Sequence, residues 1–287
     1  MIEKRVCIVG LGLMGGSLAK ALHGRVKHLT GVDQHAATRQ LALAEGVVDI
    51  VTDDLSSAVK SADLVILATP VHSILQHIEQ LPELCPDGCL VMDLGSTKEA
   101  VCESMAALPI SFAAIGGHPM CGKETAGYHA ADAGLFQGQT FVLSRNGRTT
   151  EQIEDLALSL IVLIGAHPMF LAAEVHDQIV AVTSHLPYLI SAVLIHRAAD
   201  MADDRVWPVS ASGFRDSSRL AGSDPRMMLD ILLTNREAIL SQLAQYQADL
   251  QYVSSLLAEK DEVSLAAWLA ESQRQYVTYR KNKQSPD

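Results

Sequence analysis

The feature that most constrains the fold is a glycine pattern near the start of the chain. Gly10-Leu11-Gly12-Leu13-Met14-Gly15 directly follows the β-branched run Arg5–Val9 and opens a helical pattern. In such a pattern Gly10 permits a tight turn, Gly12 lets backbone N–H groups approach an anion, and Gly15 lets a helix pack closely on a strand. The strand–turn–helix context therefore predicts the first unit of a parallel α/β sheet.

The first half of the chain continues to alternate short apolar runs with helical patterns. Several runs are apolar almost throughout, which is typical of strands covered by helices on both faces. Right-handed crossovers then predict a Rossmann-type α/β fold, a doubly wound and mostly parallel sheet with its ligand crevice at the carboxyl ends of the strands. The expected strands are Arg5–Val9, His28–Val32, Val47–Val51, Asp63–Thr69, Cys89–Asp93, Ser111–Ile115, Thr140–Ser144 and Pro168–Leu171, with a helix over Glu151–Ile164.

Strand signals stop after about residue 173. Val175–Ala199 is a long apolar helical pattern that Pro187 interrupts, and Ser223-Asp224-Pro225 is a typical helix start. Apolar residues at heptad spacing follow, at Ile239, Leu243, Tyr246, Leu250, Val253 and Leu257. This seam needs a partner helix, either in the same chain or in a second copy. We expect an α/β domain over 1–173 and an all-α domain over 174–287.

Composition excludes several classes of protein. With 48% hydrophobic and 19% charged residues the chain is globular, and a net charge of −11 with no basic tract argues against a nucleic-acid partner. The chain enters structure within a few residues, so we expect no signal peptide. An odd number of cysteines (Cys7, Cys85, Cys89, Cys102 and Cys121) suits reduced thiols in the cytoplasm.

Two alternative interpretations are disfavoured. No residue between Asp155 and Glu174 is formally charged, which approaches the length of a membrane span. Gly165 and His167-Pro168 interrupt this stretch, so a helix ending near Gly165 and a following strand explain it better than a membrane span. Cys85 and Cys89 resemble half of a metal site, but no second pair completes one, so we expect no metal.

The end of the second strand indicates which nucleotide the glycine loop binds. Asp33 lies where a carboxylate accepts hydrogen bonds from an adenosine ribose and repels a 2′-phosphate, which favours NAD over NADP. Arg39 lies close enough to weaken that preference. The expected cofactor residues are Gly10, Gly12, Leu13, Met14, Gly15, Asp33, Thr69, Pro70 and Ser96.

Three further clusters carry reactive side chains. The first is Asp93-Leu94-Gly95-Ser96-Thr97-Lys98, after the fifth strand, and the second is Gly116–Glu124, which includes His118-Pro119-Met120. The third is divided among His176-Asp177, Ser184-His185-Leu186-Pro187-Tyr188 and Gly213–Arg219, which includes Phe214-Arg215-Asp216. From the glycine loop to about residue 230, the chain resembles the prephenate/arogenate dehydrogenases of tyrosine biosynthesis.

The resemblance implies oxidative decarboxylation of prephenate to 4-hydroxyphenylpyruvate, or of arogenate to tyrosine, by a dimer built through the helical domain. By that resemblance His118 is the catalytic proton acceptor, held in a loop by neighbouring glycines and Pro119, and imidazole suits this role near neutral pH. Ser96 orients the substrate hydroxyl, although as an isolated serine it also suits a helix N-cap ahead of Lys98.

The resemblance also implies a set of substrate-binding residues. Arg219 binds a carboxylate with its planar, bidentate guanidinium. An unchanged Michaelis constant in Arg219→Ala would instead indicate Arg215 or Lys98 as the anchor. Tyr188 stands where some relatives have histidine, which leaves open how the protein binds the substrate side chain. The expected substrate-binding residues are Arg219, His176, Tyr188, Ser184, Glu124 and Arg215.

Two rival functions remain. The 3-hydroxyacid dehydrogenases share this architecture, but they use a lysine base in the helical half, and Val175–Ala199 contains no lysine. A regulator that senses NAD without catalysis would need no combination of His118, Ser96 and Arg219. Such a regulator predicts binding of NADH without turnover of any cyclohexadienol.

Overall fold

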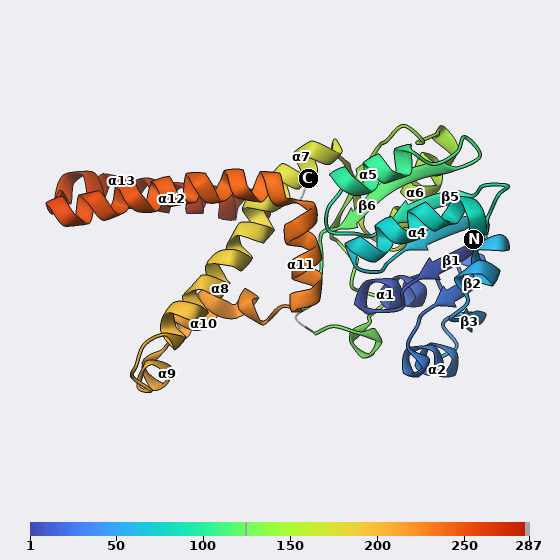
Figure 1. Cartoon of the computed structure of the whole chain (residues 1–287), viewed down its shortest axis with the longest axis horizontal. Helices are drawn as coiled ribbons and strands as arrows, with labels where there is room; N and C mark the ends of the chain where they lie inside the picture. Colours follow the sequence, from blue (N-terminus) through green and yellow to red (C-terminus); the bar gives the residue numbers. More distant parts are fainter. Residues whose placement is uncertain (124, 285–287) are drawn as a thin grey trace. The chain divides into compact units, whose positions relative to one another are not determined.

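The structure is a computed structural model that describes residues 1–123 and 125–284. The chain forms two compact units, Met1–Ile239 and Leu240–Asp287. The first unit contains the whole sheet and the helices that surround it, and the second contains most of a helical hairpin (Figure 1). The site described below lies entirely within the first unit.

The sheet of the first unit has eight strands in the order β3-β2-β1-β4-β5-β6-β7-β8 across the described residues. All neighbouring pairs are parallel except β6 and β7, which are antiparallel. This arrangement confirms the predicted doubly wound, mostly parallel sheet. The strands are β1 Ile2–Val9, β2 Val26–Val32, β3 Ile50–Thr52, β4 Leu64–Leu67, β5 Leu90–Asp93, β6 Ala113–Pro119, β7 Thr140–Ser144 and β8 His167–Phe170.

Helices cover both faces of this sheet. Successive side chains of a strand point to opposite faces, and in β1 Val6 and Ile8 enter one core cluster while Cys7 and Val9 enter the other. Residues of α1 and α6 share the first cluster, and residues of α3, α4 and α5 share the second. The flanking helices are α1 Leu13–Leu22, α2 Ala36–Ala44, α3 Leu55–Lys60, α4 Val71–Leu84, α5 Glu99–Ala106 and α6 Glu151–Leu163, with the short η1 Tyr128–Ala130.

Strand β6 differs from its prediction in a way that matters for the site. It runs over Ala113–Pro119 rather than Ser111–Ile115, because its last residues pair with β7 and place His118 opposite Val142. His118 therefore lies on a strand, and the expected loop around it is wrong. Glycine and proline at the end of a strand imitate a turn when only local signals are available.

The helical part begins with α7 Ala173–Val180 and α8 Leu186–Ala199, which η2 Ala181–His185 joins as a π-helical turn. The predicted interruption is thus confirmed, but it precedes Pro187, which lies in the first turn of α8. Single π-turns are frequent at functional sites. The remaining elements of this unit are α9 Val206–Val209, α10 Ser212–Ser218, η3 Arg219–Gly222 and α11 Pro225–Thr234.

One helical stretch of the described chain, Ala173–Ala199, is long and apolar enough to cross a membrane on length and composition alone. One such stretch is weak evidence for a membrane span. Only 22% of its most apolar part is buried in the single chain, so its apolar side chains remain largely exposed. The stretch suspected from sequence, Asp155–Glu174, instead contains the end of α6 and all of β8, as expected.

The second unit is formed by most of α12 Arg236–Glu259 and by α13 Glu262–Gln284, which run antiparallel (Figure 1). The predicted heptad seam lies on α12. Leu243, Tyr246 and Val253 are half-buried, but Leu250 and Leu257 are 52% and 60% exposed. The single chain therefore leaves part of this apolar seam exposed.

Candidate active site

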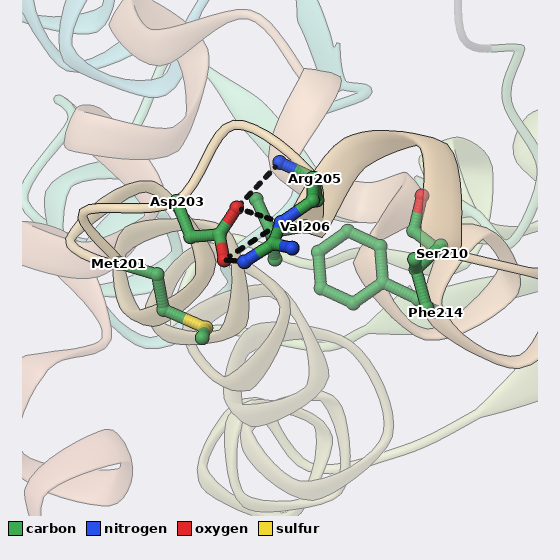
Figure 2. Close-up of a pocket in the computed structure, with 7 residues that line it drawn as sticks. Met201, Asp203, Arg205, Val206, Ser210 and Phe214 are labelled. Carbon is green, nitrogen blue, oxygen red and sulfur yellow. Dashed lines mark hydrogen bonds and ion pairs between the residues drawn. The ribbon is translucent and has the colours of Figure 1, made fainter.

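A surface hollow of about 500 Å³ lies at the end of α8, beside α9 and α10 (Figure 2). Its lining is mainly apolar, and a salt bridge of 2.6 Å between Arg205 and Asp203 borders it. The lining residues are Met201, Asp203, Arg205, Val206, Val209, Ser210 and Phe214. None of the predicted site residues that the structure describes lines this hollow. The candidate site lies instead at the carboxyl ends of the strands.

The glycine loop has the geometry that a pyrophosphate site needs. Gly10 has a φ of +93°, and a Cβ on Gly15 would lie 1.8 Å from the Gly10 carbonyl oxygen. A Cβ on Gly12 would meet nothing within 4 Å. Gly12 is the N-cap of α1 without a side-chain cap, so the first N–H groups of this helix are available to an anion.

Asp33 directly follows β2 and is oriented by the loop itself. Its carboxylate oxygens accept hydrogen bonds from the Leu11 N–H at 2.9 Å and the His35 N–H at 2.8 Å. Each carboxylate oxygen keeps a further lone pair for a hydroxyl donor. Within the described part of the chain, the buried Thr69 hydroxyl at the end of β4 has no hydrogen-bond partner, and its methyl group lies against Gly10. These residues therefore fit a dinucleotide.

The guanidinium of Arg39 is engaged by oxygens of the protein itself. Its guanidinium donates to the backbone oxygens of Asp33 and Gln34 at 2.8 and 3.0 Å. It also forms a 2.8 Å salt bridge with Asp53. Engagement by three oxygens leaves it less available to a 2′-phosphate and strengthens the preference that Asp33 indicates.

A buried ion pair joins the ends of β5 and β6. Asp93, the last residue of β5, accepts hydrogen bonds from the Gly117 N–H at 2.9 Å and the Gly95 N–H at 2.7 Å. Its carboxylate also pairs with the Lys98 ammonium, and both side chains are fully buried. Lys98 is thus part of the scaffold, and the suggestion that it is an alternative substrate anchor is wrong.

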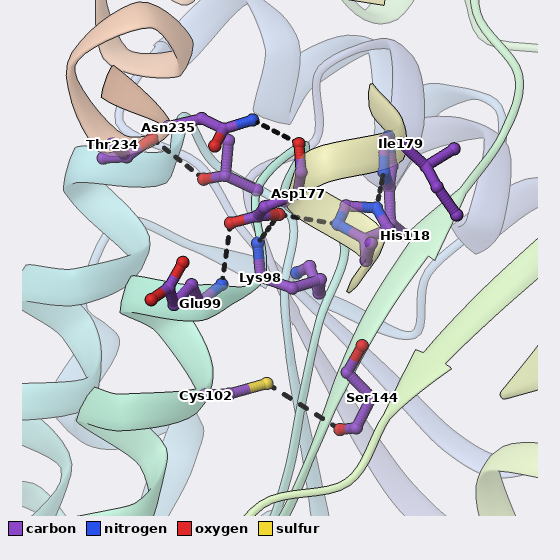
Figure 3. Close-up of polar contacts among 12 residues, drawn as sticks. Lys98, Glu99, Cys102, His118, Ser144, Asp177, Ile179, Thr234 and Asn235 are labelled. Atoms are coloured by element: carbon purple, nitrogen blue, oxygen red, sulfur yellow. Dashed lines mark hydrogen bonds and ion pairs between the residues drawn. The ribbon is translucent and has the colours of Figure 1, made fainter. Parts of the chain in front are cut away.

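The catalytic candidate His118 is hydrogen-bonded to a second histidine (Figure 3). His118 Nδ1 and His176 Nε2 are 2.8 Å apart, and His176 Nδ1 lies 2.7 Å from Asp177 Oδ1. His176 and Asp177 are both 1% exposed, whereas His118 is half-buried. Residues 58 positions apart therefore form a continuous chain from β6 to α7.

Asp177 also caps α5 from outside that helix. Its carboxylate accepts hydrogen bonds from the Lys98 N–H at 2.7 Å and the Glu99 N–H at 2.9 Å, as Figure 3 shows. No side-chain cap comes from the residues next to the helix. The N-cap expected of Ser96 is therefore wrong, and the half-buried Ser96 lies in the loop between Asp93 and α5.

A second layer supports this chain of residues. The Asn235 amide, which is 4% exposed, donates to the Asp177 carbonyl oxygen at 2.8 Å and to His185 Nδ1 at 3.1 Å. Burial lowers the pKa of His185 to about 4. Burial also lowers the pKa of His118 well below its ordinary value, and nearby His176, Lys98 and His185 lower it further. Both imidazoles are neutral at physiological pH.

The other predicted substrate residues lie on the helical elements. Ser184 is exposed in η2, and Tyr188 is half-buried on α8. Arg215 is exposed on α10, 3.2 Å from Asp216, and Arg219 is exposed in η3. Glu124 lies outside the described residues. The described contacts bring together only His118 and His176 from the set predicted to act on substrate.

Sequence reasoning missed the supporting role of several buried polar residues. Asp93, Asp177, His185 and Asn235 make contacts with partners far away in the sequence. The one local signal was the adjacency of His176 and Asp177, since a carboxylate beside a histidine often orients its ring.

The fold and the site define a nucleotide-binding α/β protein with a hydrogen-bonded histidine pair beside its ligand crevice, as expected of an oxidoreductase. Residues 18–170 match the family described as "Prephenate dehydrogenase, nucleotide-binding domain", and residues 172–271 match "Prephenate dehydrogenase, dimerization domain". The chain belongs to the prephenate dehydrogenase family, as its sequence motifs predicted.

Individual relatives agree with this assignment. The cyclohexadienyl dehydrogenase of Zymomonas mobilis is 33% identical over 279 residues, which cover 95% of this chain and 95% of the relative. Prephenate dehydrogenase from A. aeolicus, solved in complex with hydroxyphenyl propionate and NAD+, has a TM-score of 0.90 and 27% identity over 97% of this chain and 99% of its own. Synechocystis arogenate dehydrogenase has a TM-score of 0.81 and 31% identity over 96% and 99%.

Proposed function

We propose that this protein catalyses the NAD-dependent oxidative decarboxylation of prephenate to 4-hydroxyphenylpyruvate. The observation that carries the proposal is the neutral, hydrogen-bonded His118 at the end of β6, where a doubly wound sheet presents its ligand crevice. A neutral imidazole is a ready acceptor for the proton of a substrate hydroxyl. Membership of the prephenate dehydrogenase family supports the choice of substrate.

The cofactor proposal rests on the glycine loop and Asp33. The open space over Gly12 and the uncapped start of α1 suit the pyrophosphate, and the carboxylate of Asp33 suits a ribose without a 2′-phosphate. Leu13, Met14, Thr69 and Pro70 complete the surroundings of the nucleotide, and Ser96 lies towards its nicotinamide end. Bound NAD+ supplies a hydride acceptor for the carbinol carbon of the substrate.

The protein's own side chains manage the proton and the carboxylates. His118 accepts the hydroxyl proton as the carbinol becomes a carbonyl, and Ser96 orients that hydroxyl. The ring carboxylate leaves as carbon dioxide, the electron pair of the broken bond aromatises the ring, and His118 returns the proton to the phenol oxygen, so that no net proton is released. Arg219 binds a substrate carboxylate through a bidentate pair, the strongest geometry that a guanidinium offers.

The remaining substrate contacts belong to the helical half. Tyr188 and Ser184 lie on α8 and η2, next to the segment that carries His176. We assign them, together with Arg215 and Glu124, to the substrate pocket. The side chain of arogenate carries an ammonium group, which an anionic partner would bind best. Tyr188 offers a hydroxyl and no negative charge, and the keto-acid side chain of prephenate needs no anionic partner. We therefore favour prephenate over arogenate.

The domain boundary and the assembly of subunits are proposed together. We propose a boundary near residue 173, with 1–173 binding the dinucleotide and 174–287 providing the substrate and dimer contacts. The match to a family dimerisation domain and the exposed seam residues Leu250 and Leu257 support a homodimer. A small anionic substrate and a soluble cofactor suit a cytoplasmic enzyme.

The test is a spectrophotometric assay of the purified full chain. Prephenate and arogenate are each supplied with NAD+ or NADP+, and reduced cofactor is followed by absorbance. We expect the fastest turnover with prephenate and NAD+. His118→Asn should retain NAD+ binding but lower kcat by about 10²–10⁴-fold, the usual scale for loss of a general base. Binding of NAD+ without turnover of either substrate would contradict the proposal and favour a sensor.

A further inference from the structure

The direction of the hydrogen bonds behind His118 is set by Asp177. Its carboxylate faces the backbone N–H groups of Lys98 and Glu99, at 2.7 and 2.9 Å, and a backbone N–H can only donate. Asp177 is therefore an acceptor on this side, at a helix N-terminus whose dipole favours a negative charge. Since its side chain is 1% exposed, no bulk water competes for these oxygens.

This acceptor fixes the proton on His176. Asp177 Oδ1 lies 2.7 Å from His176 Nδ1, so that nitrogen carries the hydrogen and donates it. In a neutral imidazole the other nitrogen then bears a lone pair. The neutral form of His176 therefore accepts a hydrogen bond at Nε2, and the atom that faces it, 2.8 Å away, is His118 Nδ1.

The same logic assigns the tautomer of His118. Its Nδ1 donates to His176, which leaves His118 Nε2 unprotonated and able to accept a proton. Both ring nitrogens of His176 are then used within the protein, and neither remains for substrate. The geometry is held from two sides, because Asn235 also binds the Asp177 backbone at 2.8 Å.

We propose that His176 and Asp177 are positioning residues that hold His118 as the Nδ1–H tautomer and keep its Nε2 free as the proton acceptor. The proposal rests on the proposed function, in which His118 takes the hydroxyl proton. It assigns His176 an indirect role through His118, rather than a direct contact with the substrate.

The first experiment reads the tautomer without any reaction. Heteronuclear NMR of isotope-labelled ring nitrogens is recorded on the resting full-length protein, and the His118 signals are assigned by their loss in His118→Asn. We expect a protonated Nδ1 and an unprotonated Nε2 on His118. A protonated Nε2 on neutral His118 would overturn the proposal, whatever reaction the protein catalyses.

The second experiment uses a matched pair of variants at His176. The amide of glutamine in His176→Gln reaches the position of Nε2 and can still accept from His118, whereas the shorter asparagine in His176→Asn reaches only the position of Nδ1. We expect His176→Asn to lower kcat by about 10-fold or more and His176→Gln to restore most of that loss, consistent with one hydrogen bond. KM for prephenate should stay unchanged in both. Equal kcat values in the two variants at equal thermal stability would overturn the positioning role.

Asp177→Ala tests the other end of the chain. It removes Oδ1, which faces both the Lys98 N–H and His176 Nδ1, so the proton of His176 is no longer held on Nδ1 and His118 loses its preference for the Nδ1–H tautomer. We expect kcat to fall by about 10-fold or more, less than the ~10⁴-fold loss in the serine-protease triad when its histidine is held in the wrong tautomer. Unchanged kcat, together with an unchanged tautomer by NMR, would overturn the proposal. A wild-type protein inactive on prephenate and arogenate would refute only the proposed function, since the NMR experiment still reports the tautomer.

Discussion

At the scale of single residues, the site contains two histidines that burial keeps uncharged. His185 is 1% exposed, and its pKa is lowered to about 4 from 6.5 mainly by burial. The pKa of His118 is lowered in the same direction. Two neutral imidazoles and a fully buried Lys98–Asp93 pair give the site a fixed pattern of donors and acceptors. Such a pattern orients a proton acceptor.

Burial of His185 predicts how stability depends on pH. The unfolded chain takes up a proton near pH 6.5 and the folded chain only near pH 4, so the unfolded state binds more protons between these values. Stability therefore falls as the pH drops through this window, by about 3 kcal/mol at most for this group. His185→Asn retains an acceptor facing Asn235 but does not titrate, so the slope should become shallower.

Urea unfolding at several pH values between 6.5 and 4 measures this slope. His196, exposed on α8, provides the control, since His196→Asn should leave the slope unchanged. An identical slope in His185→Asn and wild type would show that His185 does not titrate with this shift.

At the scale of elements, two glycines of the loop have different roles. We expect Gly15 to be needed for folding and Gly12 for nucleotide binding. A Cβ at position 15 would lie 1.8 Å from the Gly10 oxygen, whereas a Cβ at position 12 meets nothing within 4 Å. We expect Gly15→Ala to lower thermal stability. Gly12→Ala should change stability by no more than about 1 kcal/mol, the usual cost of alanine at an N-cap. It should nevertheless weaken NAD+ binding strongly, because its methyl group would project into the position that we propose for the pyrophosphate.

Thermal melts and calorimetric titration with NAD+ measure the two effects separately. Gly12→Ala is the informative variant, since it leaves the free protein intact. An unchanged Kd for NAD+ in this variant would mean that the cofactor does not lie over the loop.

Local sequence signals predicted most helices and strands, but not the features that depend on pairing or packing between them. The sheet, α6 and the start of α11, where Asp224 caps the helix, follow from periodicity and capping residues. The extension of β6 to Pro119 depends on pairing with β7, and the π-turn before Pro187 depends on packing. Neither is encoded in a short window of sequence.

The candidate site shows the same limit. Asp33 and His118 were predicted from motifs, and the structure places them at the carboxyl ends of β2 and β6, on the same edge of the sheet. Ser96 was a reasonable local cap for α5, yet Asp177 provides that cap from 78 and 79 positions away. A cap contributed across the fold leaves no signature near the helix it stabilises.

At the scale of the whole molecule, the exposed apolar side chains predict assembly. Leu250 and Leu257 on α12 are 52% and 60% exposed. We expect Leu250→Glu with Leu257→Glu to convert a dimer to monomers, because buried carboxylates at a helical interface carry a large desolvation cost. Sedimentation velocity measures the change.

A matched control lies on the nucleotide-binding half. Ile110 is 87% exposed, so Ile110→Glu alters a comparable apolar side chain away from the seam. It should leave the sedimentation coefficient unchanged. A dimer that persists in the double variant would place the subunit contact outside this seam.

The cap that α7 provides to α5 limits how such a protein can be recombined. A chimaera that joined residues 1–170 of one relative to the remainder of another would inherit the histidine of β6 from one parent and its carboxylate support from the other. The hybrid would retain a working proton acceptor only if the donated helices met the sheet with the spacing that Asp177 and Asn235 keep here. Recombination of such halves would therefore succeed between parents in which the helices meet the sheet with the same spacing, whatever their overall sequence similarity.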